Sequence, residues 1–217
     1  MAAAEGVCPV ARGEPVGALP GLAKRMVTVP NAYIDDAMCP RPRAANAAPQ
    51  LLTLARMMPQ KRLDLMLDAF ARVERRGARL TILGDGPLRP MLEQRAAALG
   101  IGDRVAMPGF VADVLPALRE ADLFLLSSDY EGLPAAALEA LACGVPVVTT
   151  DCFASARDLL GGAAGCAVTP VGDTAALAQA IDRSLAQPRN ADCSWIVPPA
   201  AMRLRCPSSP GCPSSPR

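Results

Sequence analysis

Short apolar runs recur along the middle of the chain, each separated from the next by a longer segment of mixed polarity. Runs of this length, flanked by Gly, Pro and polar residues, are typical of buried strands. They lie at residues 51–54, 80–83, 105–107, 123–126, 145–150 and 166–168. Together they predict a sheet whose strands are covered on both faces.

The segments between these runs carry apolar residues at helical spacing. The clearest one ends at Gly77 and places five apolar side chains on one face: Leu63, Met66, Leu67, Phe70 and Val73. Further helices are predicted up to residue 99, where Gly100 would end the helix, and over residues 114–119, 135–142 and 155–160. Asp173 is placed to cap a last helix that runs to residue 185.

Strands that alternate with helices predict an open, doubly wound parallel sheet of the Rossmann-like α/β class. Around the fourth run, for example, Pro134 opens a helix that Gly144 ends, which gives a strand–helix–strand unit with a right-handed crossover. The loops that follow the strands all meet at the carboxyl edge of such a sheet. Folds of this type bind their ligands at that edge.

Both ends of the chain lack this regularity. Residues 1–31 carry Gly and Pro at close intervals and are predicted to be a leader and the remnant of an interdomain linker. Residues 32–188 are predicted to form the folded domain. Residues 189–217 are rich in Pro, Ser and Cys and repeat the letters CPSSP, so we expect them to be disordered.

Composition and charge exclude several classes of protein. The formal net charge of +1 gives no general polyanion-binding surface, and aromatic residues, at 3%, are too few for base-stacking platforms on nucleic acid. No apolar run approaches the ~20 residues that cross a bilayer. The first residues lack the basic start and apolar block of a secretory signal. We therefore expect a cytoplasmic protein that binds no nucleic acid.

Eight cysteines raise the question of a metal site or a disulfide framework. Their spacing contains no C-x-x-C pair, and the chain has no histidine. Cys143 and Cys166 fall in segments predicted to be buried, where cysteine behaves as a small apolar residue. We expect the cysteines to be structural or incidental, and we predict no metal site.

Two carboxylates stand out around the helix predicted at residues 135–142. Glu131 lies in the loop before it, and Glu139 lies among Ala and Leu within it. Because burying an unpaired carboxylate is costly, Glu139 should face water, pair with a cation or accept hydrogen bonds from a ligand. The start of the helix also offers free N–H groups that suit an anion. The alternative is a solvent-facing Glu139, with Glu131 interacting only with the helix dipole.

The residues around these carboxylates resemble a known family. The segment reads SSDYEGLPAAALEALACGVPVV, with Glu131 and Glu139 at the two ends of an EX7E spacing. It is similar to the EX7E signature of retaining glycosyltransferases of group 1, also called family 4, which have the GT-B architecture. The resemblance covers about residues 27–188. It implies one half of a GT-B enzyme, the C-terminal domain that binds a nucleotide-sugar donor.

The resemblance implies a role for two cations that follow the first strand. Arg56 and Lys61 would neutralise the donor diphosphate, and their charge would stabilise the departing group more strongly in the transition state than in the ground state. Ala55 departs from the family, which commonly has glycine at this position. The alternative is a pair of solvated surface cations.

The resemblance also assigns the carboxylates and the donor-binding positions. Glu139 would accept hydrogen bonds from both ribose hydroxyls, and Glu131 would lie beside the transferred sugar, as a hydroxyl anchor or as the nucleophile. The other donor-binding positions are glycines after the second and third strands, an aromatic residue beside the base, and the start of the helix: Gly84, Gly86, Gly109, Phe110, Gly132, Leu133, Pro134 and Ala135.

Both ends of the chain depart from the family pattern. The family has an acceptor domain with a catalytic-side histidine before the linker, and helices that return to that domain at the other end. This chain has about thirty other residues before the linker, no histidine, and the Pro/Ser tail. We therefore expect either a truncated or frame-shifted chain or a real tail, and we expect no useful sugar transfer by this chain alone.

The resemblance implies a hexosyltransferase-type enzyme that transfers a sugar from a UDP-linked donor with retention, without a cofactor, in bacterial cell-surface polysaccharide or lipopolysaccharide synthesis. The expected partners are the nucleotide-sugar, a sugar or lipid-linked acceptor, a partner chain with the acceptor domain, and the inner face of the membrane. Two alternatives stay open. One is a non-catalytic nucleotide-sugar-binding module that acts with a partner chain. The other is an unrelated doubly wound binding domain, which the joint presence of Arg56, Lys61, Glu131 and Glu139 disfavours.

Overall fold

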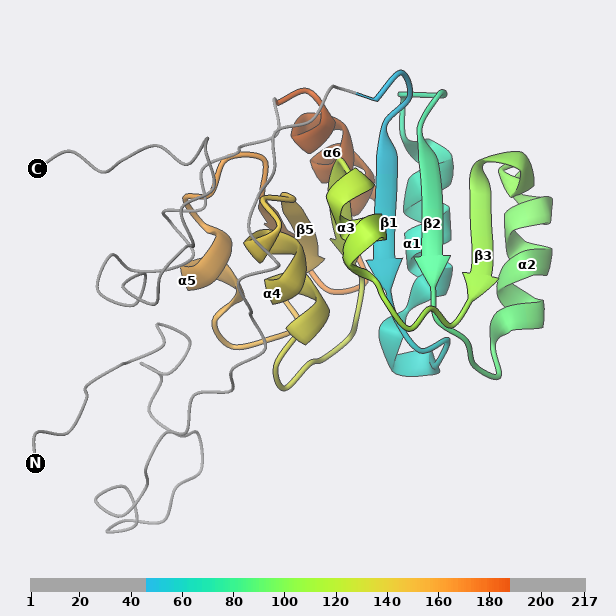
Figure 1. Cartoon of the computed structure of the whole chain (residues 1–217), viewed down its shortest axis with the longest axis horizontal. Helices are drawn as coiled ribbons and strands as arrows, with labels where there is room; N and C mark the ends of the chain where they lie inside the picture. Colours follow the sequence, from blue (N-terminus) through green and yellow to red (C-terminus); the bar gives the residue numbers. More distant parts are fainter. Residues whose placement is uncertain (1–45, 188–217) are drawn as a thin grey trace, which may run out of the picture.

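A parallel sheet of six strands organises residues 46–187, the part of the chain that the computed structural model describes (Figure 1). The strand order is β3-β2-β1-β4-β5-β6. Their bounds are β1 Gln50–Leu54, β2 Arg79–Leu83, β3 Val105–Gly109, β4 Leu123–Leu126, β5 Val147–Thr150 and β6 Ala167–Thr169. This order reverses between β1 and β4, as in doubly wound nucleotide-binding folds. The predicted Rossmann-like sheet is confirmed.

Within residues 46–187, six α-helices cover the two faces of the sheet: α1 Leu63–Arg72, α2 Arg89–Ala98, α3 Leu115–Glu120, α4 Ala135–Ala142, α5 Ala156–Leu160 and α6 Thr174–Leu185. Short 3-10 turns lie at Pro59–Lys61 and Gly102–Arg104. Buried residues of α1, α2 and α6 pack against one face, and those of α3, α4 and α5 pack against the other. In Figure 1, α3 and α4 lie in front of the sheet and α1 lies behind it.

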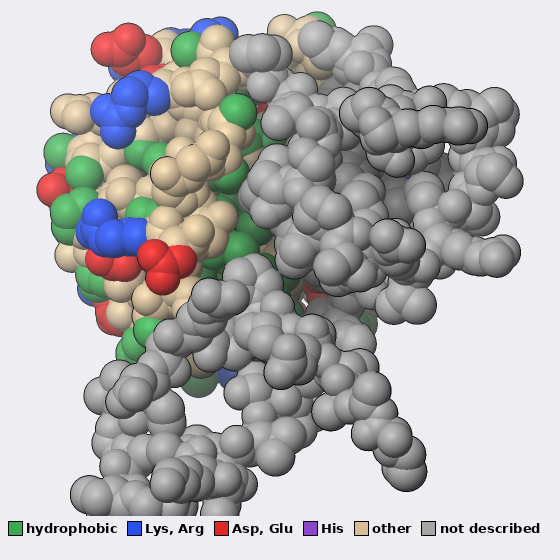
Figure 2. Space-filling view, turned by 90° about the vertical axis from the view of Figure 1, so that its left-hand side faces the viewer, with side chains coloured by type: hydrophobic (Ala, Val, Ile, Leu, Met, Phe, Trp, Pro, Cys, Tyr) green, Lys and Arg blue, Asp and Glu red, His purple; other side chains and the backbone are tan. Residues whose placement is uncertain are grey.

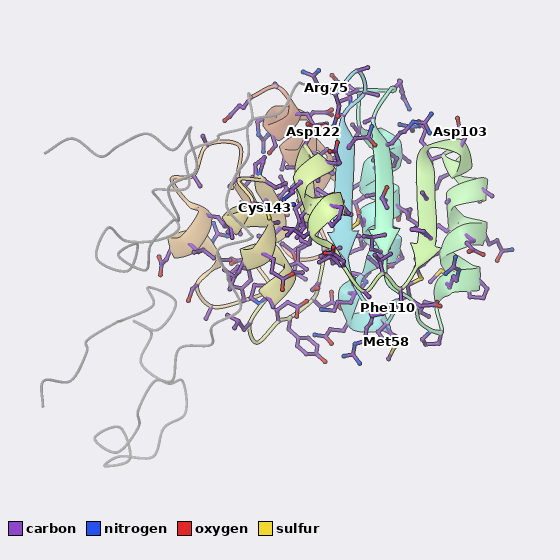
Figure 3. All side chains as sticks on the ribbon, viewed as in Figure 1. Met58, Arg75, Asp103, Phe110, Asp122 and Cys143 are labelled. Atoms are coloured by element: carbon purple, nitrogen blue, oxygen red, sulfur yellow. The ribbon has the colours of Figure 1, made fainter. Side chains whose placement is uncertain are left out.

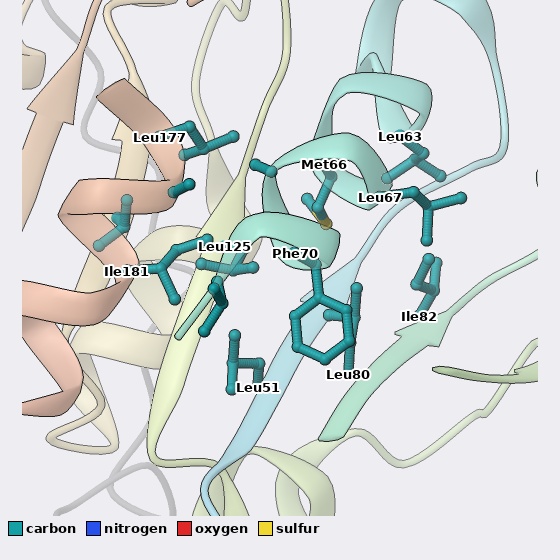
Figure 4. Close-up of a cluster of buried hydrophobic side chains, with 14 of the residues drawn as sticks. Leu51, Leu63, Met66, Leu67, Phe70, Leu80, Ile82, Leu125, Leu177 and Ile181 are labelled. Atoms are coloured by element: carbon teal, nitrogen blue, oxygen red, sulfur yellow. The ribbon is translucent and has the colours of Figure 1, made fainter. Parts of the chain in front are cut away.

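Alternating side chains of the strands form two separate cores. Leu51 of β1 packs with α1 and α6, around the fully buried Phe70 (Figure 4). The next residue, Leu52, points to the opposite face and packs with Phe124 and Leu141. The period of two in the side-chain direction of a strand explains why the runs are apolar throughout. The sheet is therefore rigidly held from both sides.

Two element boundaries differ from the sequence prediction. Helix α1 ends at Arg72 rather than Gly77, and the backbone N–H of Glu74 donates to the Asp182 carboxylate of α6 at 3.1 and 3.2 Å. This contact with a distant residue replaces a helical hydrogen bond. Strand β5 begins at Val147 rather than at residue 145, because the N–H of Val145 donates to Ala140 O and still belongs to the end of α4.

Several predictions concern residues outside the described range. The leader and linker at 1–31, the start of the domain at 32–45 and the tail at 189–217 are among them. Within residues 46–187, no helix is both long and apolar enough to cross a membrane. On the coloured part of the face in Figure 2, basic and acidic side chains lie next to one another rather than forming a patch of one sign.

Candidate functional site

The loops that follow β1 to β4 meet at the carboxyl edge of the sheet. This is the lower edge in Figure 1, toward which the arrows of β1, β2 and β3 point. In Figure 3, Met58 and Phe110 lie at this edge, whereas Arg75, Asp103 and Asp122 lie at the opposite one. Parallel strands thus bring together residues that are far apart in the sequence. The predicted gathering of loops is present.

Two of these loops are joined by a ladder of hydrogen bonds. We call residues 55–62 the β1 loop and residues 127–134 the β4 loop. Ser127 Oγ donates to Lys61 O at 2.8 Å, and the N–H of Asp129 donates to Gln60 O at 2.9 Å. The side chain of Gln60 in turn donates to Tyr130 O at 2.6 Å. The two loops therefore form one unit at the point where the strand order reverses.

Lys61 and Glu131 are in direct contact within this unit. Lys61 Nζ lies 2.5 Å from Glu131 Oε1, and Ser128 Oγ donates to the same oxygen at 2.6 Å. The Glu131 side chain is 9% exposed and that of Lys61 is 19% exposed, so the attraction is screened less than on an open surface. Sequence reasoning placed both residues at this edge but did not predict that they pair, and it missed Ser128.

The β4 loop is also held from the side of β5. Thr150 Oγ1 donates to Ser128 O at 2.6 Å, and the N–H of Glu131 donates to Cys152 O at 2.6 Å. Thr150 is buried at the end of its strand. The sequence could have indicated this contact. A threonine at the end of an apolar, buried strand carries a hydroxyl that needs a hydrogen-bond partner nearby.

Arg56 and Lys61 occupy different environments in the β1 loop. The Arg56 side chain is exposed, and no carboxylate pairs with it among the residues that the structure describes. Lys61, by contrast, is engaged by Glu131. Arg56 is therefore the cation of this loop that is already available to an anion.

The glycines after β2 serve the packing of two loops. A Cβ on Gly84, whose φ is 128°, would lie 2.2 Å from Ala55 O, and a Cβ on Gly86 would lie 2.6 Å from Met57 O. The backbones are close because Ala55 N donates to Leu83 O and Met57 N to Asp85 O, both at 2.9 Å. These two glycines therefore allow the β1 loop to pack closely against the turn after β2.

The turn after β3 completes the edge. Gly109 has a φ of 96°, and its carbonyl accepts a hydrogen bond from Gly84 N at 2.8 Å. The next residue, Phe110, is 82% exposed. Met58 and Tyr130, also in edge loops, are exposed at 37% and 66%. Exposed apolar side chains at a ligand-binding edge suit contact with a flat organic group.

The start of α4 offers unpaired backbone donors. Pro134 precedes the helix without a side-chain cap. The N–H groups of Gly132 and Leu133 make no hydrogen bond to any of residues 46–187, whereas Ala135 N donates to Leu133 O at 2.9 Å. Two free amides at the positive end of a helix dipole favour an anion.

Glu139 lies in the second turn of α4 and is half-buried. Burial raises the pKa of its carboxyl above the ordinary value, because desolvation disfavours the charged form. Its carboxylate has no hydrogen bond or ion pair with any described residue. A partly desolvated carboxylate with free acceptor oxygens is a common feature of a binding site.

The cysteines within the described range take no part in this edge as nucleophiles. Cys143, Cys152 and Cys166 form no disulfide bonds. Burial raises the pKa of Cys166 to about 11 and also raises the pKa of Cys152. Both are therefore protonated at neutral pH, which makes them poor nucleophiles and poor metal ligands. Among residues 46–187, no three His, Cys, Asp or Glu side chains gather as metal ligands would.

Comparison with known proteins identifies the family of the chain. Residues 48–187 match the family described as "Glycosyl transferases group 1". The lipopolysaccharide core biosynthesis glycosyltransferase LpsE of Rhizobium meliloti is 34% identical over 139 residues, which are 64% of this chain and 40% of LpsE. The GDP-mannose-dependent alpha-(1-6)-phosphatidylinositol monomannoside mannosyltransferase of Mycolicibacterium smegmatis is 34% identical over 154 residues, 66% of this chain and 40% of that enzyme.

A solved structure shares both fold and sequence. HepE of Anabaena in complex with UDP and glucose matches with a TM-score of 0.58 and 26% identity, over 62% of this chain and 38% of HepE. The chain therefore spans well under half the length of these three relatives. The doubly wound domain described above corresponds to part of a GT-B architecture.

Proposed function

The chain belongs to the family of glycosyl transferases group 1, and we propose that residues 46–187 bind the nucleotide-sugar donor of a sugar transfer. The proposed reaction transfers a hexose from a UDP-linked donor to an acceptor with retention at the anomeric carbon. The proposed context is bacterial polysaccharide or lipopolysaccharide synthesis, with a sugar or lipid-linked acceptor at the inner face of the membrane. The relative LpsE is named for lipopolysaccharide core biosynthesis, which supports this context.

The observation that carries this proposal is the meeting of Lys61 and Glu131 at 2.5 Å, beside the free amides of Gly132 and Leu133. A cation, a helix start and a carboxylate at one point suit a donor that carries a diphosphate next to a hydroxyl-bearing sugar. Phosphate oxygens would bind the cation and the amides. Sugar hydroxyls would donate to the carboxylate.

In the proposed site, Arg56 and Lys61 contact the diphosphate. Negative charge on the departing diphosphate grows as the bond to the sugar breaks, so these cations stabilise the transition state more than the ground state. Their charge is supplied by the protein, and the proposed binding needs no metal. Arg56 is exposed and unpaired within the described range, so it can meet the donor first.

The nucleoside lies, in this proposal, between α4 and the turns after β2 and β3. Glu139 accepts hydrogen bonds from the ribose hydroxyls, and Phe110 with Gly109 borders the base. The free acceptor oxygens of Glu139 and the 82% exposure of Phe110 support these roles. Gly84 and Gly86 shape this part of the edge by bringing the β1 loop close.

The base of the donor is part of the proposal. HepE was solved with UDP and glucose, whereas the mycobacterial relative is named for GDP-mannose. We propose UDP, because HepE matches this chain in fold, with a TM-score of 0.58, as well as in sequence, with 26% identity.

Isothermal titration calorimetry with UDP, GDP and ADP, in buffer that contains EDTA, tests the donor site. The expected result is binding of UDP without a metal, and a higher Tm at UDP concentrations above the Kd. Absence of heat with all three nucleotides would refute the donor site. Binding of GDP alone would refute the choice of base and leave the site intact.

A non-catalytic module would share the donor site and differ only in turnover. Such a module would bind the nucleotide-sugar and act with a partner chain that holds the acceptor. A radiolabelled-donor assay against a lipid and oligosaccharide extract tests for turnover. Sugar transfer above the rate with a Lys61→Ala variant would refute the module, whereas UDP binding without transfer by this chain alone is expected for both functions.

A further inference from the structure

A residue in an unfavourable backbone conformation lies between the two loops of the site. Arg62 has a φ of 46° and a ψ of 42°, in the left-handed region. Within residues 46–187, all other residues with such a positive φ are glycines. A side chain makes this conformation unfavourable, and it persists where the surrounding contacts compensate for it. The contacts of Arg62 are therefore informative.

The guanidinium of Arg62 connects helix α1 to the β4 loop. Its Nε and Nη2 donate to the two carboxylate oxygens of Asp64, at 3.2 and 3.3 Å. This paired contact with the first turn of α1 orients the guanidinium plane. The remaining Nη1 then donates to Asp129 Oδ1 at 3.1 Å. Arg62 thus holds the β4 loop from a helix that the core fixes in place.

The ion pair lies next to the residues that form the proposed donor site. Arg62 follows Lys61 in the chain, and Asp129 precedes Glu131 by one intervening residue. The carbonyl of Arg62 also accepts from Ser127 Oγ at 3.0 Å, within the same ladder that joins the two loops. We propose that Arg62 is a positioning residue, whose ion pair with Asp129 holds the β4 loop so that Lys61 and Glu131 stay in contact.

Global stability does not account for an arginine here. The side chains of Arg62 and Asp129 are 31% and 37% exposed, and ion pairs of that exposure contribute little to folding. Glycine would adopt the left-handed conformation without the steric penalty. The arginine therefore has a local role, which is to set the geometry of the two loops.

The first test uses hydrogen exchange and needs no ligand. The amide of Asp129 donates to Gln60 O across the two loops and reports directly on their contact. In Arg62→Gly and in Asp129→Asn, this amide should exchange at least about fivefold faster than in the wild type. Asp129→Asn leaves the backbone of Arg62 unchanged and so provides a second variant if Arg62→Gly folds poorly. Unchanged exchange in these variants would overturn the proposal.

A matched control separates the loop contact from the loss of any ion pair. Arg95 of α2 pairs with Asp68 of α1 at 2.5 Å, and neither side chain makes a hydrogen bond or ion pair with the β4 loop. Asp68→Asn should leave exchange of the Asp129 amide unchanged. Arg62→Lys keeps a cation that can reach Asp129 and should retain most of the protection. If Asp68→Asn and Asp129→Asn increased the exchange rate of this amide equally, the increase would reflect general destabilisation. That result would contradict the positioning role of Arg62.

The second test rests on the proposed function and compares UDP affinity with stability. Arg62→Gly should bind UDP about two- to fivefold more weakly, because it loosens the β4 loop and with it the Gly132 and Leu133 amides that are proposed to hold the phosphates; this is the range for a partly exposed ion pair. Its Tm should be unchanged or higher, because glycine suits the backbone. Weaker binding with a matching loss of Tm would contradict positioning. If the wild type binds no nucleotide, the donor site fails, whereas the exchange measurement still decides the role of Arg62.

Discussion

Single residues of the β1 and β4 loops depend on one another. Lys61 and Glu131 hold each other in contact, so a diphosphate that binds Lys61 competes with the Glu131 carboxylate for it. Ser128 Oγ also donates to Glu131 and would remain after Lys61 moves away. The carboxylate could then accept a sugar hydroxyl without becoming a buried charge with no partner. In the proposed function, binding of phosphate and recognition of sugar would be coupled through this pair.

Substitution of Lys61 by alanine should weaken UDP binding. The expected loss is about 1.5–3 kcal/mol, the range for a hydrogen bond to a charged group. Titration calorimetry measures it. Arg183→Ala is the matched control, because Arg183 is an exposed cation on α6. If Lys61→Ala and the control bind UDP equally well, Lys61 does not contact the diphosphate.

The two carboxylates should respond differently to replacement by glutamine. Glu139→Gln should weaken UDP binding by about 1–3 kcal/mol, because an amide offers one acceptor oxygen in place of two. Glu131→Gln should keep or increase UDP affinity, since it releases Lys61, and should remove the preference for a UDP-sugar over UDP. A comparable loss of UDP affinity in both variants would show that these roles are assigned wrongly.

Glu139 should also give the stability of the protein a characteristic pH dependence. Burial raises the pKa of its carboxyl in the folded chain, so folding favours the protonated form. Its contribution is fully present below the unfolded pKa of about 4 and is lost as the pH rises through the folded value. Glu139→Gln should therefore raise the Tm at pH 7, and the difference should disappear toward pH 4. A lower Tm of the variant at pH 7 would contradict this assignment.

At the scale of elements, the turns that follow β1 and β2 form one packed unit. Their backbones are linked by hydrogen bonds from Ala55 N and Met57 N, and the glycines between them leave no room for side chains. The position of the β1 loop therefore depends on Gly84 and Gly86 in the turn after β2. These glycines also fix the positions of Arg56 and Lys61, although they act through packing rather than through a contact with the proposed ligand. Packing between loops determines the geometry of the site.

Gly84→Ala should destabilise the fold strongly. The added Cβ would lie 2.2 Å from Ala55 O, and the φ of 128° is itself unfavourable for alanine. The expected loss in the free energy of unfolding is at least about 3 kcal/mol, measured by urea denaturation. Gly77→Ala is the control, because nothing lies within 4 Å of its Cβ position, and it should change stability by less than about 0.5 kcal/mol. Equal stabilities of the two variants would contradict the observed packing.

At the scale of the whole molecule, the two edges of the sheet should differ in their response to a ligand. Addition of UDP should shift the backbone amide signals of edge residues such as Met58 and Phe110, because their loops border the proposed site. Arg75, Asp103 and Asp122 lie at the opposite edge (Figure 3) and should not shift. Amide shift mapping by NMR measures both sets. Shifts confined to the amino edge would place nucleotide binding elsewhere on the domain.

The sequence by itself determined the elements and their class. Apolar runs and helical spacing are local properties, and within residues 46–187 they located the six strands and the α-helices, although they placed the end of α1 at Gly77 instead of Arg72 and missed the two 3-10 turns. The cap at Asp173 was also predictable, and its carboxylate accepts from Ala176 N at 2.8 Å. Alternation of strands and helices then implied a parallel sheet, and with it the shared edge for residues as distant as Arg56 and Glu131.

Only the tertiary structure decided which of these residues meet. The contact between Lys61 and Glu131 joins loops that are 70 residues apart, and it depends on the pairing of β1 with β4 and on the support of the β4 loop by Thr150. The end of α1 was decided by Asp182 on another helix. The partners of Gly84, Gly86 and Arg62 were likewise set by neighbouring loops. Such contacts arise from packing between segments, which local sequence periodicity does not encode.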